Sequence, residues 1–269
     1  MRRVRIAAQV APQHTSWSGI RDVVMRMEDL GVDIVFNWDH FFPLTGDLEG
    51  TSFESWTMLA AIAEQTERVE FGPLVSCTGF RNADLQADMA RTIDHISAKN
   101  GVGRFIFGTG SGWFERDFVE YGYEFGTAGQ RLDRLAEDLP RVRTRWAKLN
   151  PAPTRRIPIL IGGGGERKTL RIVAEHADIW HSFADPEEYA HKLGVLDAWC
   201  AEVGRDRSEI ELSTGLGPRG QGSVNPAVLD TQYALGITLF EAVALGPDFN
   251  DSPVRALLDW RRSRGLDGA

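Results

Sequence analysis

Two residues that can exchange or bind protons, Asp39 and His40, stand side by side among aromatic residues in segment 37–43, NWDHFFP. Histidine can carry a proton near neutral pH, and a carboxylate can accept a hydrogen bond from a ring N–H or a hydroxyl. The neighbouring aromatic residues suit a flat, partly apolar ligand. The segment predicts proton transfer beside such a ligand, and the alternative is an aspartate at a helix start next to an exposed histidine.

Four consecutive glycines, 162–165, follow an apolar run and precede Arg167 and Lys168. Glycine tolerates positive φ and leaves its backbone N–H groups open to a ligand, and the start of a following helix adds a positive dipole end. Because the two cations add charge, the segment predicts an anion site. Its spacing matches neither the Walker loop nor the GxGxxG fingerprint, and a purely structural turn is the alternative.

Other segments that follow apolar runs also carry small or polar residues. Segment 72–81 offers a floor for a ring system, or reads as a loop with a buried thiol. Segment 108–117 is glycine-rich and contains Ser111, which can bind a ligand oxygen or cap a helix. His181 follows a later run and can face the same site. The first run ends in segment 9–13, QVAPQ, without the His-x-His pair of many metal-dependent barrel hydrolases, so we expect no metal site.

The elements that must position these residues alternate between strand-like and helical patterns. Eight apolar runs are typical of parallel strands buried on both faces, and they cover Val4–Val10, Ile34–Trp38, Val69–Cys77, Arg104–Gly108, Ile157–Ile161, Asp178–Phe183, Glu211–Gly215 and Leu239–Leu245. Helical patterns cover 20–30, 53–66, 83–96, 130–146, 168–176, 186–203, 226–235 and 253–264. Eight βα units favour an α/β fold of the (β/α)8 TIM-barrel type, in which chemistry gathers at the carboxyl ends of the strands.

Two features interrupt this regular pattern. Pro140 lies inside the helical run 130–146 and predicts a kink or a split helix there, because proline removes a backbone donor and clashes with the preceding turn. Segment 215–226 contains four glycines and is the one long irregular loop that we expect. Since no repeat or Gly/Ser linker divides the chain, a single domain over residues 1–269 is predicted.

Composition narrows the class of partner. The chain has 269 residues and a formal net charge of −8, which disfavours nucleic acid as a partner. The partner that we expect is a small-molecule substrate. Two cysteines without a CxxC pair fit a reducing compartment. No run approaches the roughly 18 apolar residues of a membrane span, and the N-terminus lacks a signal-like core. We therefore expect a cytoplasmic protein with no membrane partner.

Together, four motifs resemble the luciferase-like flavin and deazaflavin oxidoreductases, and within them the members that use coenzyme F420. The resemblance spans about two thirds of the chain, and its motifs are specific only in combination. They are NWDHFFPL at 37–44, DMARTIDHIS at 88–97, GTGSGWFER at 108–116 and IGGGGERKTL at 161–170.

This resemblance implies a TIM barrel that forms a homodimer, with the F420 ring in the barrel mouth and its phosphate and oligoglutamate tail over the glycine-rich loop. Asp39 would contact the ring or its hydroxyls, and His40 would lie near the reacting carbon as proton donor or acceptor. Leu74 and Val75 would form a non-prolyl cis peptide that supports the ring, with Ser76 beside it. The other implied cofactor contacts are Ser111, Gly112, Gly164, Gly165, Arg167 and Lys168.

The chain departs from the sugar-phosphate dehydrogenases of this family at one informative position. Those enzymes carry a glutamate directly after a Ser/Thr-Gly pair, whereas this chain has Trp113, and Glu115 follows two residues later. The departure indicates a flatter or more apolar substrate. Segment 148–156 leaves little room for the insertion that covers the site in many relatives, so we expect an open pocket.

A deazaflavin has carbon where a flavin has the nitrogen that helps it react with oxygen, so it carries hydride instead of activating oxygen. The expected activity is hydride transfer between F420 and a small organic substrate, with His40 moving the proton. The alternatives are an FMN-dependent luciferase-like monooxygenase, which would use the same barrel mouth, and a non-catalytic F420-binding protein.

Overall fold

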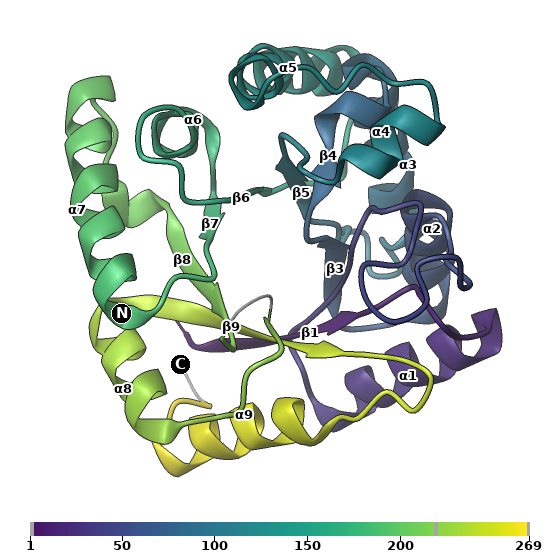
Figure 1. Cartoon of the computed structure of the whole chain (residues 1–269), viewed down its shortest axis with the longest axis vertical. Helices are drawn as coiled ribbons and strands as arrows, with labels where there is room; N and C mark the ends of the chain where they lie inside the picture. Colours follow the sequence, from purple (N-terminus) through teal and green to yellow (C-terminus); the bar gives the residue numbers. More distant parts are fainter. Residues whose placement is uncertain (1–2, 218–219, 268–269) are drawn as a thin grey trace.

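The chain folds into a barrel of parallel strands surrounded by helices (Figure 1). A computed structural model describes residues 3–217 and 220–267. Its strands are β1 (Arg5–Val10), β2 (Ile34–Asn37), β3 (Glu70–Pro73), β4 (Ser76–Cys77), β5 (Phe107–Gly110), β6 (Ile159–Gly162), β7 (Ile179–His181), β8 (Glu211–Gly215) and β9 (Ile237–Ala244). The predicted TIM-barrel class is confirmed.

Strands β3 and β4 are two halves of the single run expected at 69–77. They are separated by a cis peptide bond between Leu74 and Val75, as the resemblance implied. The sheet order is β3-β2-β1-β9-β8-β7-β6-β5-β4, and an isolated parallel bridge links Phe71 of β3 to Phe105, which lies just before β5. Nine strands therefore occupy the eight positions of the barrel, and each expected strand is present.

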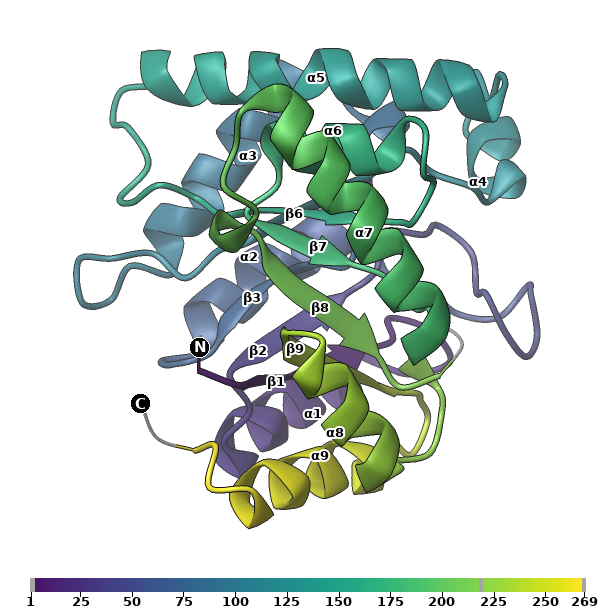
Figure 2. The same cartoon turned by 90° about the vertical axis from the view of Figure 1, so that its left-hand side faces the viewer.

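The helices follow the strands on the outside of the barrel (Figure 2). They are α1 (Trp17–Leu30), α2 (Ser55–Gln65), α3 (Ala83–Ile96), α4 (Glu115–Glu120), α5 (Ala128–Lys148), α6 (Thr169–His176), α7 (Pro186–Val203), α8 (Pro226–Ala234) and α9 (Ser252–Ser263). Helix α4 was not expected from the sequence. None of these helices, within the described ranges, is long and apolar enough to cross a bilayer.

Helix α5 runs unbroken through Pro140, so the expected split is wrong. Thr127 and Gln130 form a capping box at its start, which satisfies backbone donors that would otherwise have no partner. Leu135, Leu139 and other apolar side chains bury one face of the helix. Pro140 lies on the exposed side, where one missing backbone hydrogen bond does not outweigh this packing.

The core consists of an outer and an inner layer. The outer layer packs strand residues such as Phe71 and Phe107 against helix residues such as Trp56 and Trp146. The inner layer fills the barrel with Ala7, Ile34, Phe36, Leu74, Ile106, Leu160, Ile179 and Leu239. Strands between these two layers are buried on both faces, which explains their near-continuous apolar sequence.

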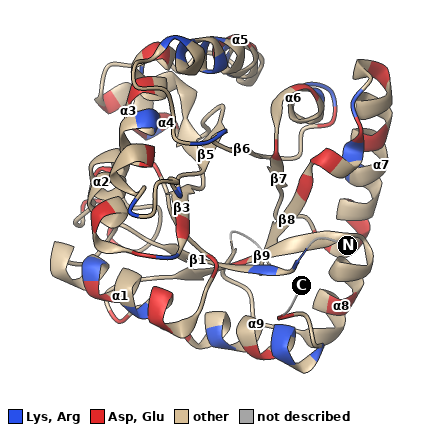
Figure 3. Cartoon of the chain, turned by 180° about the vertical axis from the view of Figure 1, so that it is seen from behind, with Lys and Arg blue, Asp and Glu red and all other residues tan. Residues whose placement is uncertain are grey.

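Lys and Arg alternate with Asp and Glu along the outer helices (Figure 3). Several of these charges pair one turn apart, for example Arg171 with Glu175 and Arg255 with Asp251. Such exposed pairs contribute little to stability, so the charge on the outer helices mainly keeps them solvated.

The expected long irregular loop at 215–226 follows β8. In its described part, Gly217 and Gly220 have positive φ, and the N–H of Gly220 donates to the carbonyl of Gly217 at 3.3 Å. Gln221 reaches the wall of the cavity described below. Residues 218 and 219 lie outside the described part of the chain.

Candidate active site

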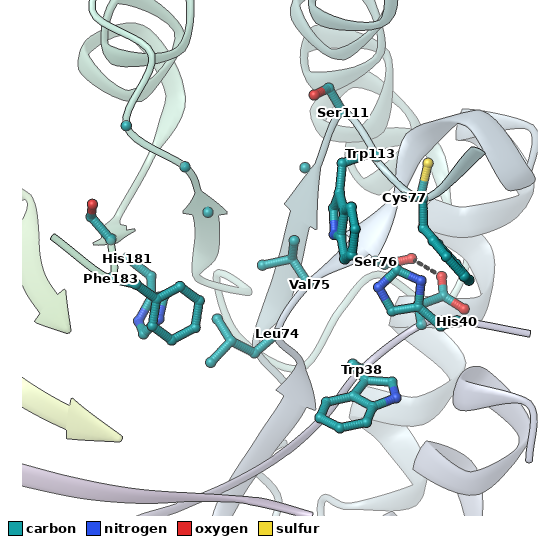
Figure 4. Close-up of a pocket in the computed structure, with 18 of the residues that line it drawn as sticks. Trp38, His40, Leu74, Val75, Ser76, Cys77, Ser111, Trp113, His181 and Phe183 are labelled. Atoms are coloured by element: carbon teal, nitrogen blue, oxygen red, sulfur yellow. Dashed lines mark hydrogen bonds between the residues drawn. The ribbon is translucent and has the colours of Figure 1, made fainter. Parts of the chain in front are cut away.

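A cavity of about 600 Å³ lies at the carboxyl ends of the barrel strands. The segments that follow β2, β4, β5, β6 and β7 contribute to its wall. In Figure 4, His40 and Trp113 lie on one side, His181 and Phe183 lie on the other, and Leu74 and Val75 lie between them. A volume of this size accepts a cofactor ring together with a small substrate.

Most of the predicted site residues line this cavity. They are Asp39, His40, Leu74, Val75, Ser76, Ser111, Gly112 and Gly164. Gly165, Arg167 and Lys168 are absent from its wall. The Lys168 Nζ atom instead lies 2.6 Å from a carboxylate oxygen of Asp133.

The floor of the cavity is the cis peptide between Leu74 and Val75. The side-chain amide of Gln9 donates to the Leu74 carbonyl at 2.7 Å and holds this backbone from below. The Val75 side chain rises beside Gly110 and Gly162, where added Cβ atoms would lie 2.9 Å and 3.1 Å from its methyl groups. Glycine at both positions therefore leaves space for the Val75 side chain. The role of Gln9 in holding the floor was not predicted from the sequence.

His40 is held by a carboxylate that the sequence had not singled out. Its Nδ1 lies 2.6 Å from Oδ2 of Asp117, which is fully buried in α4. The other carboxylate oxygen of Asp117 accepts the Phe41 backbone N–H at 3.0 Å. Glu115 is exposed, so helix α4 turns Asp117 and not Glu115 toward the site. The rings of Trp113 and Phe114 meet the His40 ring edge-on, each with its centroid at 5.7 Å.

Asp39 belongs to a separate ionic network. Its carboxylate accepts hydrogen bonds from the Ser76 hydroxyl at 2.6 Å and from both terminal nitrogens of Arg81 at 2.6 and 3.1 Å. Arg81 also contacts Glu54 at 2.6 Å. Because Arg81 compensates its charge, Asp39 is suited to shape and polarise the wall, while His40 is the residue of the pair that can exchange a proton.

Two further side chains of the wall are titratable but do not change charge near neutral pH. Burial raises the pKa of the Cys77 thiol to about 12, so it stays protonated and is a poor nucleophile. Burial lowers the pKa of His181 to about 3, so its ring is neutral, with Nδ1 at 2.8 Å from the Ser213 hydroxyl. His181 does line the cavity, as its place after a strand had suggested.

The glycine run forms the opposite wall with a cation from α7. Gly163 has a φ of +122°, which disfavours other residues, and a side chain at Gly164 would place its Cβ 2.7 Å from Nζ of Lys192. Lys192 pairs with Glu188 at 2.6 Å, and both line the cavity. The sequence had indicated cations next to this run in the chain, whereas the cation next to it in space is Lys192.

A parallel barrel with its cavity at the strand ends, and with a wall histidine that is bound from behind by a buried carboxylate, has the layout of a barrel enzyme. The chain belongs to the luciferase-like monooxygenase family, whose model matches residues 3–218. It is 30% identical over 179 residues to the F420-dependent glucose-6-phosphate dehydrogenase of Amycolatopsis mediterranei, a match that covers 59% of this chain and 51% of that protein. It is also 30% identical over 199 residues to an uncharacterised protein of Mycobacterium tuberculosis, covering 65% and 63% of the two chains. The chain thus spans less than two thirds of these curated relatives.

Solved structures share the fold. An F420-dependent secondary alcohol dehydrogenase in complex with an F420-acetone adduct superposes with a TM-score of 0.81 at 16% identity, covering 96% of this chain and 99% of that one. The EDTA monooxygenase of Chelativorans sp. BNC1 superposes with a TM-score of 0.70 at 14% identity, covering 99% and 95%. At these identities the likeness shows the barrel and its topology.

Proposed function

We propose that this protein is an F420-dependent oxidoreductase that transfers hydride between the deazaflavin and a small uncharged substrate, with His40 as proton donor or acceptor. The observation that carries the proposal is that a histidine, a cis-peptide floor and a glycine wall lie in the same cavity. The Asp117-bound imidazole of His40 lies across the Leu74–Val75 floor from a wall of glycine backbone. A planar ring on that floor would have a proton carrier at one edge and an anion-binding end at the other.

The residues present fit this cofactor. Gly110, Gly162 and Gly164 leave space that Cβ atoms would fill, and Lys192 adds a positive charge beside the Gly164 backbone. Backbone N–H groups and a lysine suit a phosphate, so the tail would leave over this wall. When bound, F420 supplies a two-electron hydride carrier. The F420-dependent relatives support this choice, and the monooxygenase relatives support FMN as the alternative.

The substrate side of the cavity is aromatic. Trp38 and Phe114 contribute to the wall around His40, and Trp113 occupies the position after Ser111-Gly112. The acid in this region, Asp39, is already paired with Arg81. Such a wall complements a flat or apolar group better than a phosphorylated sugar. We therefore propose a secondary alcohol or its ketone, or a similar uncharged group, as the substrate class.

Cofactor titration tests the proposal. Fluorescence titration with F420, with FMN as competitor, should show tighter binding of F420. Turnover is then measured with oxidised F420 and a panel of secondary alcohols, and with reduced F420 and the matching ketones. Tighter binding of FMN together with substrate-dependent oxygen consumption would favour the monooxygenase alternative. Tight F420 binding without turnover on any acceptor would favour a non-catalytic binding protein.

Removal of the Lys192 charge should weaken F420 binding. We expect Lys192→Met to raise the Kd about 5- to 30-fold, because one charge-assisted contact to the phosphate end is lost. The effect should shrink at high salt, because salt screens the attraction between Lys192 and the phosphate. Lys168→Met is the matched control, since Lys168 pairs with Asp133 and does not line the cavity. The reverse result, with only Lys168→Met weakening binding, would restore the assignment made from sequence.

We also propose that the protein is a homodimer, as the resemblance implied. Sedimentation equilibrium should then give twice the 29.9 kDa mass of the chain. A single species at the monomer mass would refute this part of the proposal without affecting the site.

A further inference from the structure

We propose that Asp117 is a positioning residue that holds His40 in the tautomer with its proton on Nδ1, so that Nε2 presents a lone pair to the cavity. The resting histidine is then a base, ready to accept the hydroxyl proton of an alcohol. This inference rests on the proposed function for its chemistry, while the tautomer itself is independent of it.

Both oxygens of Asp117 are fixed. One lies 2.6 Å from Nδ1 of His40, and the other accepts the Phe41 backbone N–H at 3.0 Å. The Asp117 side chain is fully buried, and its own backbone N–H bonds to the Phe114 carbonyl at 3.2 Å. The carboxylate therefore cannot turn away from the imidazole without losing a second buried hydrogen bond.

This geometry decides which nitrogen of His40 carries the proton. A carboxylate only accepts hydrogen bonds, and the Phe41 N–H already uses the other oxygen as an acceptor. The short contact therefore needs a proton on Nδ1 of the imidazole. In the neutral ring Nε2 is then unprotonated, and within the described residues it has no hydrogen-bond partner.

The contrast with the neighbouring groups supports the assignment. Asp39 adjoins His40 in the chain, but its carboxylate binds Arg81 and Ser76 instead of the imidazole. His181 bonds only to a hydroxyl through Nδ1 and stays neutral. Among these groups, His40 alone has a buried carboxylate directly behind its ring.

The step balances without a further reactant. As an alcohol is oxidised, its O–H proton passes to Nε2 of His40 and the C–H bond breaks. The hydride would pass to oxidised F420, the oxidant that the proposed function supplies, while the C=O bond forms. In the reverse direction Nε2 returns the proton to the oxygen of the ketone. Asp117 accepts the hydrogen bond from Nδ1 throughout and so keeps Nε2 directed at the reacting oxygen.

Nitrogen NMR of the wild-type protein tests the tautomer directly. The 15N signals of His40, identified by their loss in His40→Gln, should show a protonated Nδ1 and an unprotonated Nε2 in the neutral ring. The chain has six histidines, and in Asp117→Asn the His40 signals should lose this pattern or show a mixture of the two tautomers. A wild-type His40 with the proton on Nε2 would overturn the proposal, and this readout needs no substrate.

Turnover then separates positioning from general stability. We expect Asp117→Asn to lower kcat on the order of 100-fold or more, with the F420 Kd and the substrate KM within about threefold. Asp117→Glu should recover part of the loss. Glu120→Gln, which removes a charge from the surface of the same helix, is the control and should leave kcat unchanged. Unchanged kcat in Asp117→Asn would overturn the role, whereas failure of F420 to bind the wild type would refute the proposed function and leave the NMR result standing.

Discussion

Replacement of His40 by glutamine should lower turnover with F420 by about 100- to 10,000-fold, which is the usual contribution of a positioned acid–base group. Glutamine keeps a polar group of similar length but cannot accept and release a proton. Because His40 lines the cavity at its aromatic wall and not at the glycine wall, the Kd for F420 should change by less than about threefold. Steady-state kinetics and fluorescence titration measure the two quantities separately.

The control for this substitution is His191→Gln. His191 is exposed on α7 and contacts Glu166 at 3.1 Å, outside the cavity wall. It should keep full turnover. If His40→Gln bound F420 normally and also kept full turnover, the proton would have to come from another group or from water, and the assignment of His40 would be wrong.

Replacement of Glu241 by glutamine should stabilise the protein, and more so at high pH. Glu241 lies on β9, pairs in the sheet with Ala7 and Gly215, and is fully buried. Neither of its carboxylate oxygens has a hydrogen-bond partner among the described residues. The backbone packs closely over it, since Cβ atoms added at Gly215 or Gly220 would lie 2.5 to 2.7 Å from these oxygens. Burial without a partner raises the pKa of Glu241 to about 8.

The sign of the pH dependence follows from this shift. The pKa of the Glu241 carboxyl is about 8 in the folded chain, whereas a glutamate exposed to water in the unfolded chain has its ordinary pKa of 4.5. Below pH 4.5 the carboxyl is protonated in both the folded and the unfolded chain, and its contribution to the free energy of unfolding is at its full value. This contribution is lost as the pH rises from 4.5 toward 8, because the unfolded chain then releases the proton more readily than the folded chain. Glutamine does not titrate, so Glu241→Gln removes this loss. The gain in the free energy of unfolding should be roughly 2–3 kcal/mol larger at pH 8 than at pH 5.5.

Urea unfolding of both proteins at the two pH values measures this difference. Glu202→Gln, at an exposed position on α7, removes the same charge and should show no such dependence on pH. An equal effect of Glu241→Gln at both pH values would mean that the carboxylate finds a partner or water in the folded protein. A loss of stability at pH 8 would mean that this partner is a cation.

The sequence was sufficient to predict the barrel and its helices other than α4. Strands buried between an inner and an outer layer must be apolar on both faces, so their runs are visible without knowledge of their neighbours. Helix ends carry local signals, such as Gly31 with its φ of 91° after α1 and Asp185 with Pro186 at the start of α7. The count of eight βα units then determines closure. Pro140 predicted a break in the helix, but the packing of α5 against the barrel outweighs this local effect, and only the folded chain shows that packing.

The sequence also identified which strand ends carry polar or small residues, because barrel topology brings every strand end to the same mouth. His40, Ser111 and glycines 162 to 164 line the cavity there, as expected. The residues that contact these groups were not predictable, because a contact between distant segments produces no recognisable spacing of residues in the sequence. Asp117 reaches His40 across 77 positions, and Lys192 lies beside Gly164 in space although Lys168 is nearer in sequence. Periodicity is a local property and determined the elements of this protein, whereas the pairing of its charges depends on how those elements pack, and only the tertiary structure decided it.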